Sequence, residues 1–356
     1  MGIETSCDET AVAIVTEDRE ILSNLVLSQQ EHIEFGGVVP EIAARAHLDH
    51  IDSMIAKSLT DNSMSFSDLD AIAVTAGPGL IGGVLVGAMS AKSIAAVHNI
   101  PLIAVNHLEG HALTVRLTDE VELPYLLLLV SGGHCQILVV EAIGKYKKLG
   151  GTLDDAIGES FDKTAKLLGL DYPGGPAVEK MALECTDHKR ALKKFPLPKP
   201  MINKKDCNFS FSGIKTAVKR YVDQLPENIE RQDAADICQS FQHSVNTVIK
   251  NKCARAIEEY LKLYPEHKNP CLVVAGGVAA NKTIRASLEN LCRDYRLKFS
   301  APPLKLCTDN AVMIAWAGME RLKLGMTDDI NFAVTPRWAL DGDVNINNLT
   351  KKGTKR

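Results

Sequence analysis

Two segments of the chain begin in the same way, with a strand, a tight turn and a second strand. The first is GIE, the turn TSCDET and AVAIVT, at residues 2–4 and 11–16. The second is PYLLLLVSGGH at 124–134, followed by CQILVVEAI at 135–143. A third strand and then alternating helices and strands follow each pair, as in α/β folds. The pattern predicts a duplicated α/β fold with a cleft between two lobes.

The length of 356 residues exceeds one typical core and fits two lobes. We expect an N-terminal lobe at 1–120, a C-terminal lobe at 121–345 and a flexible tail at 346–356. Residues 186–210 are rich in Pro and Lys and lack periodicity, which predicts a surface loop inserted in the second lobe. The first strand is shorter than the usual length of about five residues. We therefore expect upstream trimming, with a naturally short strand as the alternative.

Composition excludes several classes of protein. The chain is 46% hydrophobic and 24% charged with a net charge of −4, so it is globular and its surface as a whole does not attract nucleic acid. A local basic patch stays open. By inspection, no apolar run reaches the roughly 18–20 residues that a membrane helix needs. Nine scattered cysteines without a CxxC pair argue against a zinc ribbon or a disulfide framework and favour a reducing compartment.

Three turns carry residues that suit phosphate. ETSCDET at 4–10 offers hydroxyl and carboxylate groups, and VSGGH at 130–134 places two glycines where backbone N–H groups can approach an anion. AGGVAANKTI at 275–284 places glycines before a helix, whose N-terminus attracts negative charge. Ordinary β-turns are the alternative for each turn alone, and none of the three is a GxxxxGK[ST] or GxGxxG motif.

The segment VNHLEGHA at 105–112 predicts a metal site. His107 and His111 lie four residues apart on an expected helix, so their side chains share one face. Asp309 is the third candidate ligand. It stands where a later apolar helix begins, and a helix-capping acid is its alternative role. The motif is no HExxH peptidase site, because Leu108 follows His107 and Glu109 points away from the histidine face.

Nine stretches in one order along the chain resemble the tRNA N6-adenosine threonylcarbamoyltransferase family, formerly described as O-sialoglycoprotein endopeptidases. They span nearly the whole sequence, so the resemblance is specific. The stretches are GIETSCDET (2–10), GGVVPEIAARAH (36–47), TAGPGL (75–80), NHLEGHAL (106–113), LLVSGGH (128–134), FDKTAKLLGLDYPGGP (161–176), FSFSGIKTA (209–217), VAGGVAANKTIR (274–285) and CTDNAVMIAWAG (307–318).

The resemblance implies a fold like that of actin, Hsp70 and sugar kinases, with two RNase H-like lobes and a nucleotide between them. It implies that His107, His111 and Asp309 hold one divalent ion, Fe²⁺ or Zn²⁺, with Mg²⁺ less suited. An ion pair with Lys166 is the alternative role for Asp162. The nucleotide and substrate contacts that the resemblance implies are Leu129, Val130, Ser131, Gly132, Gly133, Asp162, Gly175 and Asn281.

The implied reaction joins threonylcarbamoyl-AMP and a tRNA adenosine to give N6-threonylcarbamoyladenosine and AMP. The target is the adenosine 3′-adjacent to the anticodon in tRNAs that read ANN codons. Glu4 or Asp8 would take the amine proton, or would simply form the turn. The seven cations of 189–205 would contact tRNA phosphates, or would form a solvated loop. These cations are Lys189, Arg190, Lys193, Lys194, Lys199, Lys204 and Lys205.

The segment HALTVRLTDEVELPYLLLLVSGGHC looks closest to the mitochondrial branch of animals. We therefore expect a mitochondrial matrix protein, or otherwise a cytoplasmic one. A homodimer is expected, with no membrane and with threonylcarbamoyl-AMP supplied by a separate synthase. Three alternatives stay open: an ATP-dependent kinase or ATPase of the same fold, a metallopeptidase, and a non-catalytic nucleotide-binding scaffold.

Overall fold

The computed structural model describes residues 1–29, 32 and 37–342. These residues form two compact units. Unit 1 holds the described residues of 1–120, 142–146 and 308–342, and unit 2 holds 121–141 and 147–307. The first division falls where the sequence predicts it, between 120 and 121. Residues 308–342 belong to unit 1, however, and not to the predicted lobe at 121–345. The tail at 346–356 lies outside the described residues.

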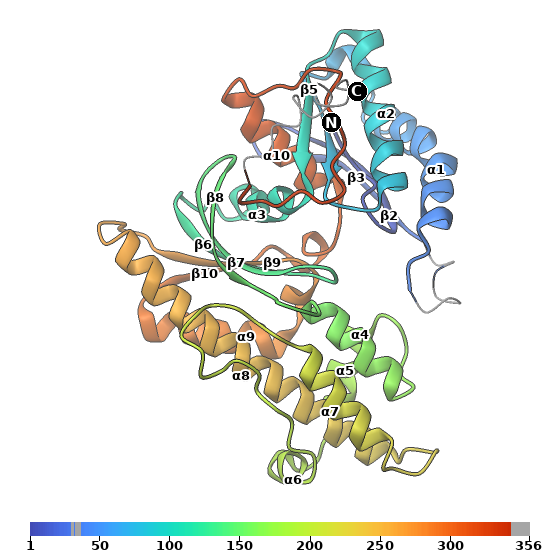
Figure 1. Cartoon of the computed structure of the whole chain (residues 1–356). Coiled ribbons are helices and arrows are strands. Elements are labelled where there is room, and N and C mark those ends of the chain that lie inside the picture. The colour runs from blue at the N-terminus through green and yellow to red at the C-terminus, as the bar shows by residue number, and fades with distance from the viewer. Residues whose placement is uncertain (30–31, 33–36, 343–356) are drawn as a thin grey trace, which may run out of the picture. The chain divides into compact units, whose positions relative to one another are not determined.

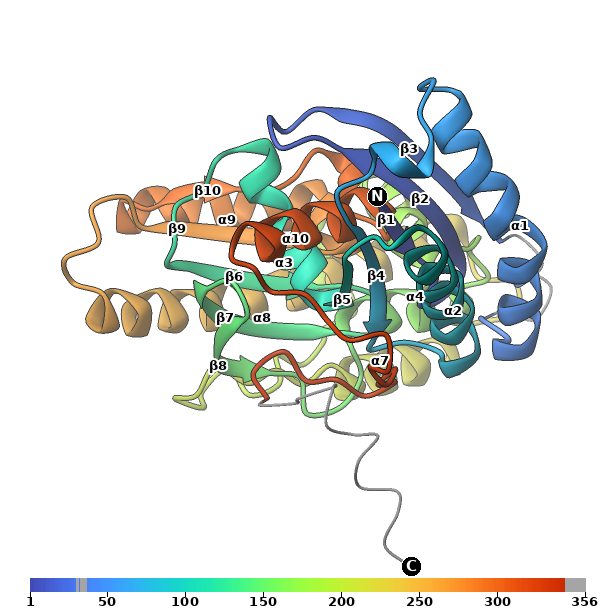
Figure 2. The ribbon, with the colours of Figure 1, turned by 90° about the horizontal axis from the view of Figure 1, so that it is seen from above.

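The sheet of unit 1 has five strands in the order β3-β2-β1-β4-β5. β1 pairs antiparallel with β2 and parallel with β4. Helices α1 and α2 pack together against β2 and β4, whereas α3 and α10 pack together near β1, β4 and β5 (Figures 1 and 2). The bounds are β1 Gly2–Glu4, β2 Glu9–Val15, β3 Ile21–Ser28, α1 Pro40–Thr60, η2 Phe66–Asp68, β4 Ile72–Gly77, α2 Ile81–His98, β5 Leu102–Asn106, α3 His107–Thr118 and α10 Ala311–Lys323.

The sheet of unit 2 repeats this plan. Its order is β10-β9-β6-β7-β8, so its first strand again lies between its second and fourth strands, as in unit 1. The shared order is the duplication that the sequence predicts. The bounds are β6 Tyr125–Val130, β7 Cys135–Ala142, β8 Lys145–Gly151, α4 Ile157–Leu167, α5 Gly174–Ala182, α6 His188–Lys194, α7 Ser212–Val222, α8 Arg231–Leu263, β9 Cys271–Ala275, η3 Gly277–Ala280, α9 Lys282–Tyr295, β10 Lys298–Ser300 and η4 Leu304–Leu306.

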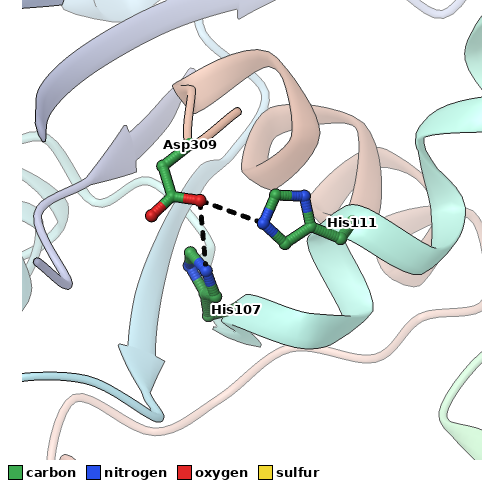
Figure 3. Close-up of side chains that lie close together, drawn as sticks. All are labelled: His107, His111 and Asp309. Carbon is green, nitrogen blue, oxygen red and sulfur yellow. Dashed lines mark hydrogen bonds and ion pairs between the residues drawn. The ribbon is translucent and has the colours of Figure 1, made fainter. Parts of the chain in front are cut away.

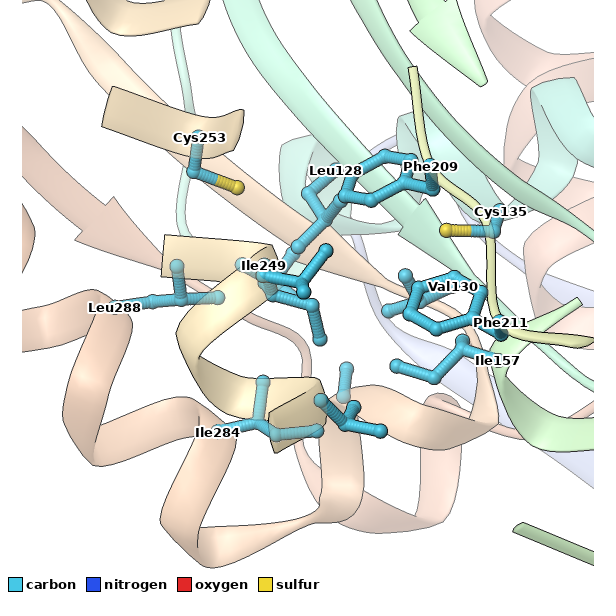
Figure 4. Packing of buried hydrophobic residues seen from close by; sticks show 14 of the residues in the cluster. Leu128, Val130, Cys135, Ile157, Phe209, Phe211, Ile249, Cys253, Ile284 and Leu288 are labelled. Atoms are coloured by element: carbon cyan, nitrogen blue, oxygen red, sulfur yellow. The ribbon is translucent and has the colours of Figure 1, made fainter. Parts of the chain in front are cut away.

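The core of unit 2 explains why its central strand is apolar along its whole length. All six residues of β6 are buried, because helices cover it and strands flank it. Figure 4 shows Leu128 and Val130 of this strand among Phe209, Ile249 and Ile284. Phe209 and Phe211 stack with ring centroids 5.8 Å apart. The motif FSFSG therefore contributes core aromatics as well as the start of α7.

Two expectations need correction. The first is the predicted loop at 186–210, which contains helix α6. This helix forms because Asp187 accepts the N–H of Arg190 as an N-cap and Ala191 is buried. It was missed because seven residues are too few to show a helical period.

The second correction concerns membrane-like segments. Helix α2 is long and apolar enough, by length and composition alone, to cross a membrane, with a mean hydropathy of 1.4. One such helix is weak support for a membrane segment, since core helices meet the same test. In the structure α2 packs against α1 and β4 and buries small residues such as Gly83, Gly87 and Ala91.

Candidate active site

The three predicted metal ligands converge within unit 1. Helix α3 begins at His107, directly after β5, because the Asn106 side chain caps it by accepting the N–H of Leu108. His111 Nε2 lies 3.0 Å from Asp309 Oδ1, and His107 Nε2 lies 3.5 Å from the same oxygen. Figure 3 shows both imidazoles turned toward this carboxylate.

The geometry of these ligands suits a tetrahedral ion. One ligand atom from each residue lies within 4.8 Å of the others. Ligand atoms about 2.0–2.2 Å from a tetrahedral ion are about 3.3–3.6 Å apart, so the observed spacing needs little change to hold one. Both histidines are buried, and Asp309 is partly exposed. Three protein ligands leave one position open, which is typical of catalytic rather than structural sites.

Glu4 fixes the ring of His107 from the opposite side. Its Oε2 lies 3.0 Å from His107 Nδ1, and Ser6 Oγ lies 3.1 Å from the same nitrogen. Thr75 donates to the other side of this carboxylate oxygen at 2.5 Å, and the Ser6 N–H donates to Oε1 at 2.5 Å. A carboxylate on the far nitrogen of a ligating histidine sets its tautomer and its orientation. Glu4 therefore supports the site from behind His107.

The electrostatics of the cluster favour a positive charge at its centre. Burial alone would lower the pKa of His107, but Asp309 and Glu4 raise it well above its usual value. Burial would likewise raise the pKa of Asp309, yet His107 and His111 hold it well below the usual range. Two carboxylates around one imidazole favour a positive charge there, whether it is a proton or a metal cation.

The predicted glycine turn of unit 2 borders open space. Its two ends are joined by a hydrogen bond, which the Ser131 N–H donates to His134 O at 2.8 Å. A side chain added at Gly132 or Gly133 would meet nothing within 4 Å. Leu129 and Val130, by contrast, are buried strand residues that place the turn. The turn thus borders open space at both glycines, where an anion has room to approach.

Asp162 lies in α4, and its side chain reaches the start of α5, where Gly175 lies, also in unit 2. Asp162 accepts the N–H of Gly174 at 2.8 Å, and within the described chain it forms no ion pair with Lys166. Burial raises its pKa, although the N–H groups of Gly174 and Gly175 oppose that effect. A side chain at Gly175 would meet nothing within 4 Å, so this glycine also borders open space.

The third predicted phosphate turn is different, because protein groups already occupy its helix terminus. Glu179 accepts the N–H groups of Lys282 at 2.7 Å and of Thr283 at 3.4 Å. Asn281 caps the same helix by accepting the N–H of Ile284. The N-terminus of α9 is therefore not a free phosphate site. The side-chain NH₂ group of Asn281 takes no part in this cap. It donates a hydrogen bond to Gln242 Oε1 at 3.1 Å.

Sequence reasoning missed two residues that order these sites. Gln242 orients Asn281 from a helix 39 positions earlier, and no local pattern signals that contact. Glu109 was recognised only as pointing away from the histidines. It is fully buried and forms an ion pair with Arg321. A charged residue in an otherwise buried helical segment was the available signal.

Comparison with known proteins decides the family. A sequence profile described as "TsaD: tRNA N6-adenosine threonylcarbamoyltransferase" matches residues 20–316. A protein of that name from Brucella anthropi is 56% identical over 346 residues, which cover 96% of this chain and 95% of the relative. Another from Paramagnetospirillum magneticum is 54% identical and covers 96% of each chain. The chain belongs to the tRNA N6-adenosine threonylcarbamoyltransferase family.

A solved structure outside this family shares the fold. HypF from T. kodakarensis superposes with a TM-score of 0.55 at 14% identity, covering 90% of this chain and 48% of that protein. At such low identity the likeness concerns the fold alone. It agrees with the repeated strand order, and the predicted α/β class with duplicated RNase H-like lobes, as in actin, Hsp70 and sugar kinases, is confirmed.

Proposed function

We propose that this chain transfers a threonylcarbamoyl group from threonylcarbamoyl-AMP to N6 of a tRNA adenosine, the one 3′-adjacent to the anticodon in tRNAs that read ANN codons. Membership of the threonylcarbamoyltransferase family, at 56% identity over nearly the full length, carries the proposal. The acyl adenylate as donor and the position of the adenosine rest on the family resemblance. The convergence of His107, His111 and Asp309 adds independent support, because a bare scaffold has no need of it.

The reaction forms one bond and breaks another at the carbamoyl carbon. The N6 lone pair attacks this carbon, and the bond to the phosphate oxygen breaks, so that AMP leaves with the electron pair. N6 must lose one proton to reach the neutral product. An exocyclic adenine amine is a weak nucleophile, since its lone pair is delocalised into the ring. Positioning of donor and acceptor therefore supplies several kcal/mol of the barrier reduction.

A divalent metal, Fe²⁺ or Zn²⁺, would be held by His107, His111 and Asp309 in this proposal. Two imidazoles and one carboxylate suit these ions better than Mg²⁺, which prefers oxygen ligands. When bound, such an ion supplies Lewis acidity toward a carbonyl or phosphoryl oxygen. In unit 2, backbone N–H groups of the turn at Gly132 and Gly133 would hold the phosphate, and Asp162 the ribose hydroxyls. Asn281 and Gly175 would complete the substrate contacts.

Of the two candidate bases, Asp8 fits the proton transfer better than Glu4. Both oxygens of Glu4 already accept hydrogen bonds, and its side chain is 1% exposed. Asp8 lies on the same turn and is partly exposed. A base must reach the proton that it removes, so we assign the positioning of His107 to Glu4 and propose proton removal for Asp8.

The tRNA-binding proposal narrows to five lysines. Arg190 pairs with Asp236, and Lys194 pairs with Asp233, so these two cations serve the packing of α6 on α8. The others are exposed and form no ion pair within the described chain. We call them the lysine patch: Lys189, Lys193, Lys199, Lys204 and Lys205. Exposed lysines without acidic partners are the groups that can contact phosphates.

A homodimer is the assembly that we propose. Ile81, Leu85 and Met89 form one face of α2, with side chains 48%, 42% and 55% exposed. Leu48 of α1 is 62% exposed, and the two helices touch where a side chain at Gly82 would lie 2.9 Å from Ala44. An apolar face of this kind suits a second copy of the chain. The mitochondrial location stays a prediction from the sequence.

Reconstitution tests the proposed function. Purified protein, threonylcarbamoyl-AMP and unmodified tRNA are combined, and the nucleosides are analysed by mass. We expect N6-threonylcarbamoyladenosine and an equal amount of AMP. His111→Ala should lower the rate by at least about a hundredfold, since even indirect partners of a metal are worth tenfold to a hundredfold. Peptide cleavage, or ATP hydrolysis without modified nucleoside, would instead favour the metallopeptidase or the ATPase.

A further inference from the structure

Helices α3 and α10, which bear or adjoin all three predicted ligands, pack unusually closely. His107 and His111 belong to α3, and Asp309 lies two residues before the first residue of α10, Ala311. At Gly110 an added side chain would lie 2.9 Å from Ile314 Cδ1 and 3.1 Å from Met313 Cγ. A larger residue there would push against these two side chains of α10. The relative placement of these two helices therefore sets the distance between the histidines and the carboxylate.

Glu109 holds the side of α3 that faces away from the ligands. Residues two apart on a helix point about 200° apart, so Glu109 projects opposite to both His107 and His111. Its Oε2 accepts two hydrogen bonds from Arg321 of α10, at 2.6 Å from the terminal nitrogen and 2.9 Å from Nε. One carboxylate oxygen is thus committed to the partner helix.

The other oxygen of Glu109 binds the turn at 142–146, which belongs to unit 1. Oε1 accepts the N–H of Gly144 at 3.1 Å and the hydroxyl of Tyr146 at 2.9 Å. Four donors on two fixed elements surround a carboxylate that is 0% exposed. An apolar side chain there would fill the space but would leave the rotation of α3 free to adjust, whereas four directional bonds fix it.

We propose that Glu109 is a positioning residue of the metal site, which locks the rotation of α3 against α10 so that His107 and His111 meet Asp309. The inference rests on the proposed metal site and extends it to a residue that no ligand touches. Arg321 and the Tyr146 hydroxyl are its partners. Metal affinity, rather than stability alone, is the property that Glu109 controls.

A second ion pair between the same helices gives the matched control. Arg116 Nε lies 2.7 Å from Glu320 Oε1, so this pair also joins α3 to α10. It lies beyond His111 along α3, and neither residue is a predicted ligand. Removing only one member of a buried pair leaves an unpaired charge that endangers folding. Both pairs are therefore replaced whole, as Glu109→Met with Arg321→Met and as Arg116→Met with Glu320→Met.

Zinc affinity of the full chain, measured by competition with a chromogenic chelator well below each melting temperature, tests the proposal. We expect the Glu109 double variant to bind zinc about tenfold more weakly, and the Arg116 double variant to stay within about twofold of the wild type. Tyr146→Phe, which removes one of the four bonds, should fall between them. Equal affinities in both double variants would overturn the role of Glu109 and leave the proposed function standing. A wild-type chain that binds no zinc or iron would overturn both.

Discussion

The two sheets have a turn at the same topological position, between their first and second strands, but the two turns differ in amino-acid composition. Between β1 and β2 the turn runs through Glu4, Ser6 and Asp8, with buried carboxylate and hydroxyl groups bonded to His107. Between β6 and β7 it consists of Ser131, two glycines and His134, with open space before the glycines. The duplicated fold therefore contains the same strand–turn–strand twice. The first turn holds charged side chains, and the second leaves open space at its glycines.

Replacing Glu4 probes the first turn. Glu4→Gln removes the charge behind His107 while keeping the size of the side chain. We expect metal affinity to fall about tenfold to a hundredfold, because the imidazole loses the partner that orients it. Competition titration with a chelator measures this change. Asp8→Asn serves as the contrast, since it should lower the rate and leave metal affinity unchanged. Equal metal affinity in the wild type and Glu4→Gln would show that the turn is merely structural.

Filling the second turn should act on the substrate instead. Gly133→Val adds a branched side chain to the turn at a position where an added Cβ meets nothing within 4 Å. We expect KM for threonylcarbamoyl-AMP to rise about tenfold, as expected when an anion is deprived of charge-assisted hydrogen bonds. The melting temperature should not change, because no clash arises. An unchanged KM would mean that the phosphate lies elsewhere, and the contrast between the turns would lose its functional meaning.

The lysine patch lies in unit 2. The neighbouring cations Arg190 and Lys194, which form ion pairs, serve as a control for it. Lys193, Lys199, Lys204 and Lys205 replaced together by Gln should weaken tRNA binding and flatten its dependence on salt, by about one unit of slope for each phosphate that the protein no longer neutralises. Arg190→Gln should lower the melting temperature instead, since its partner Asp236 is buried. Binding measured across a salt titration separates the two effects. Parallel salt slopes in the wild type and the fourfold variant would remove the patch from the tRNA surface.

The smallest expected effect concerns a cap in unit 2 that holds the start of α7. Burial would raise the pKa of Asp154, but hydrogen bonds from Ser210, Phe211 and Ser212 lower it overall. A lowered pKa adds stability above the unfolded value of about 4, and this stability is lost as pH falls through the folded value. Asp154→Ala should therefore cost about 1 kcal/mol of unfolding free energy at pH 7 and progressively less below pH 4. Denaturant unfolding at several pH values measures it, and a pH-independent cost would contradict the charge-based account.

Local patterns in the sequence predict individual helices and strands, but they do not predict contacts between distant elements. The spacing of His107 and His111 predicted a shared helical face, because a helix brings i and i+4 together without outside help. Apolar runs likewise predicted β6 and β9. The role of Glu4 behind His107 joins residues 103 positions apart, and the capping of α9 by Glu179 joins residues of two different helices. Such contacts depend on how elements pack, which no local period encodes.

The domain boundary shows the same limit. From the sequence, the apolar helix after Asp309 was predicted to belong to the second lobe, at 121–345. In the structure this helix, α10, packs against β1, β2 and β4 of the first sheet. The apolar sequence of a helix does not reveal which sheet the helix will cover. Sequence reasoning named Asp309 as a candidate ligand beside the two histidines without a reason why they should meet. The structure supplies that reason, since packing of α10 brings this carboxylate to α3.

One titration tests the central claim most directly. The chain is stripped of metal with a chelator, Zn²⁺ or Fe²⁺ is added stepwise, and formation of N6-threonylcarbamoyladenosine from threonylcarbamoyl-AMP and unmodified tRNA is followed. The account predicts no product without metal and a rate that rises to a plateau at one ion per chain. Full activity of the stripped chain would contradict it, because His107, His111 and Asp309 would then have no part in the reaction.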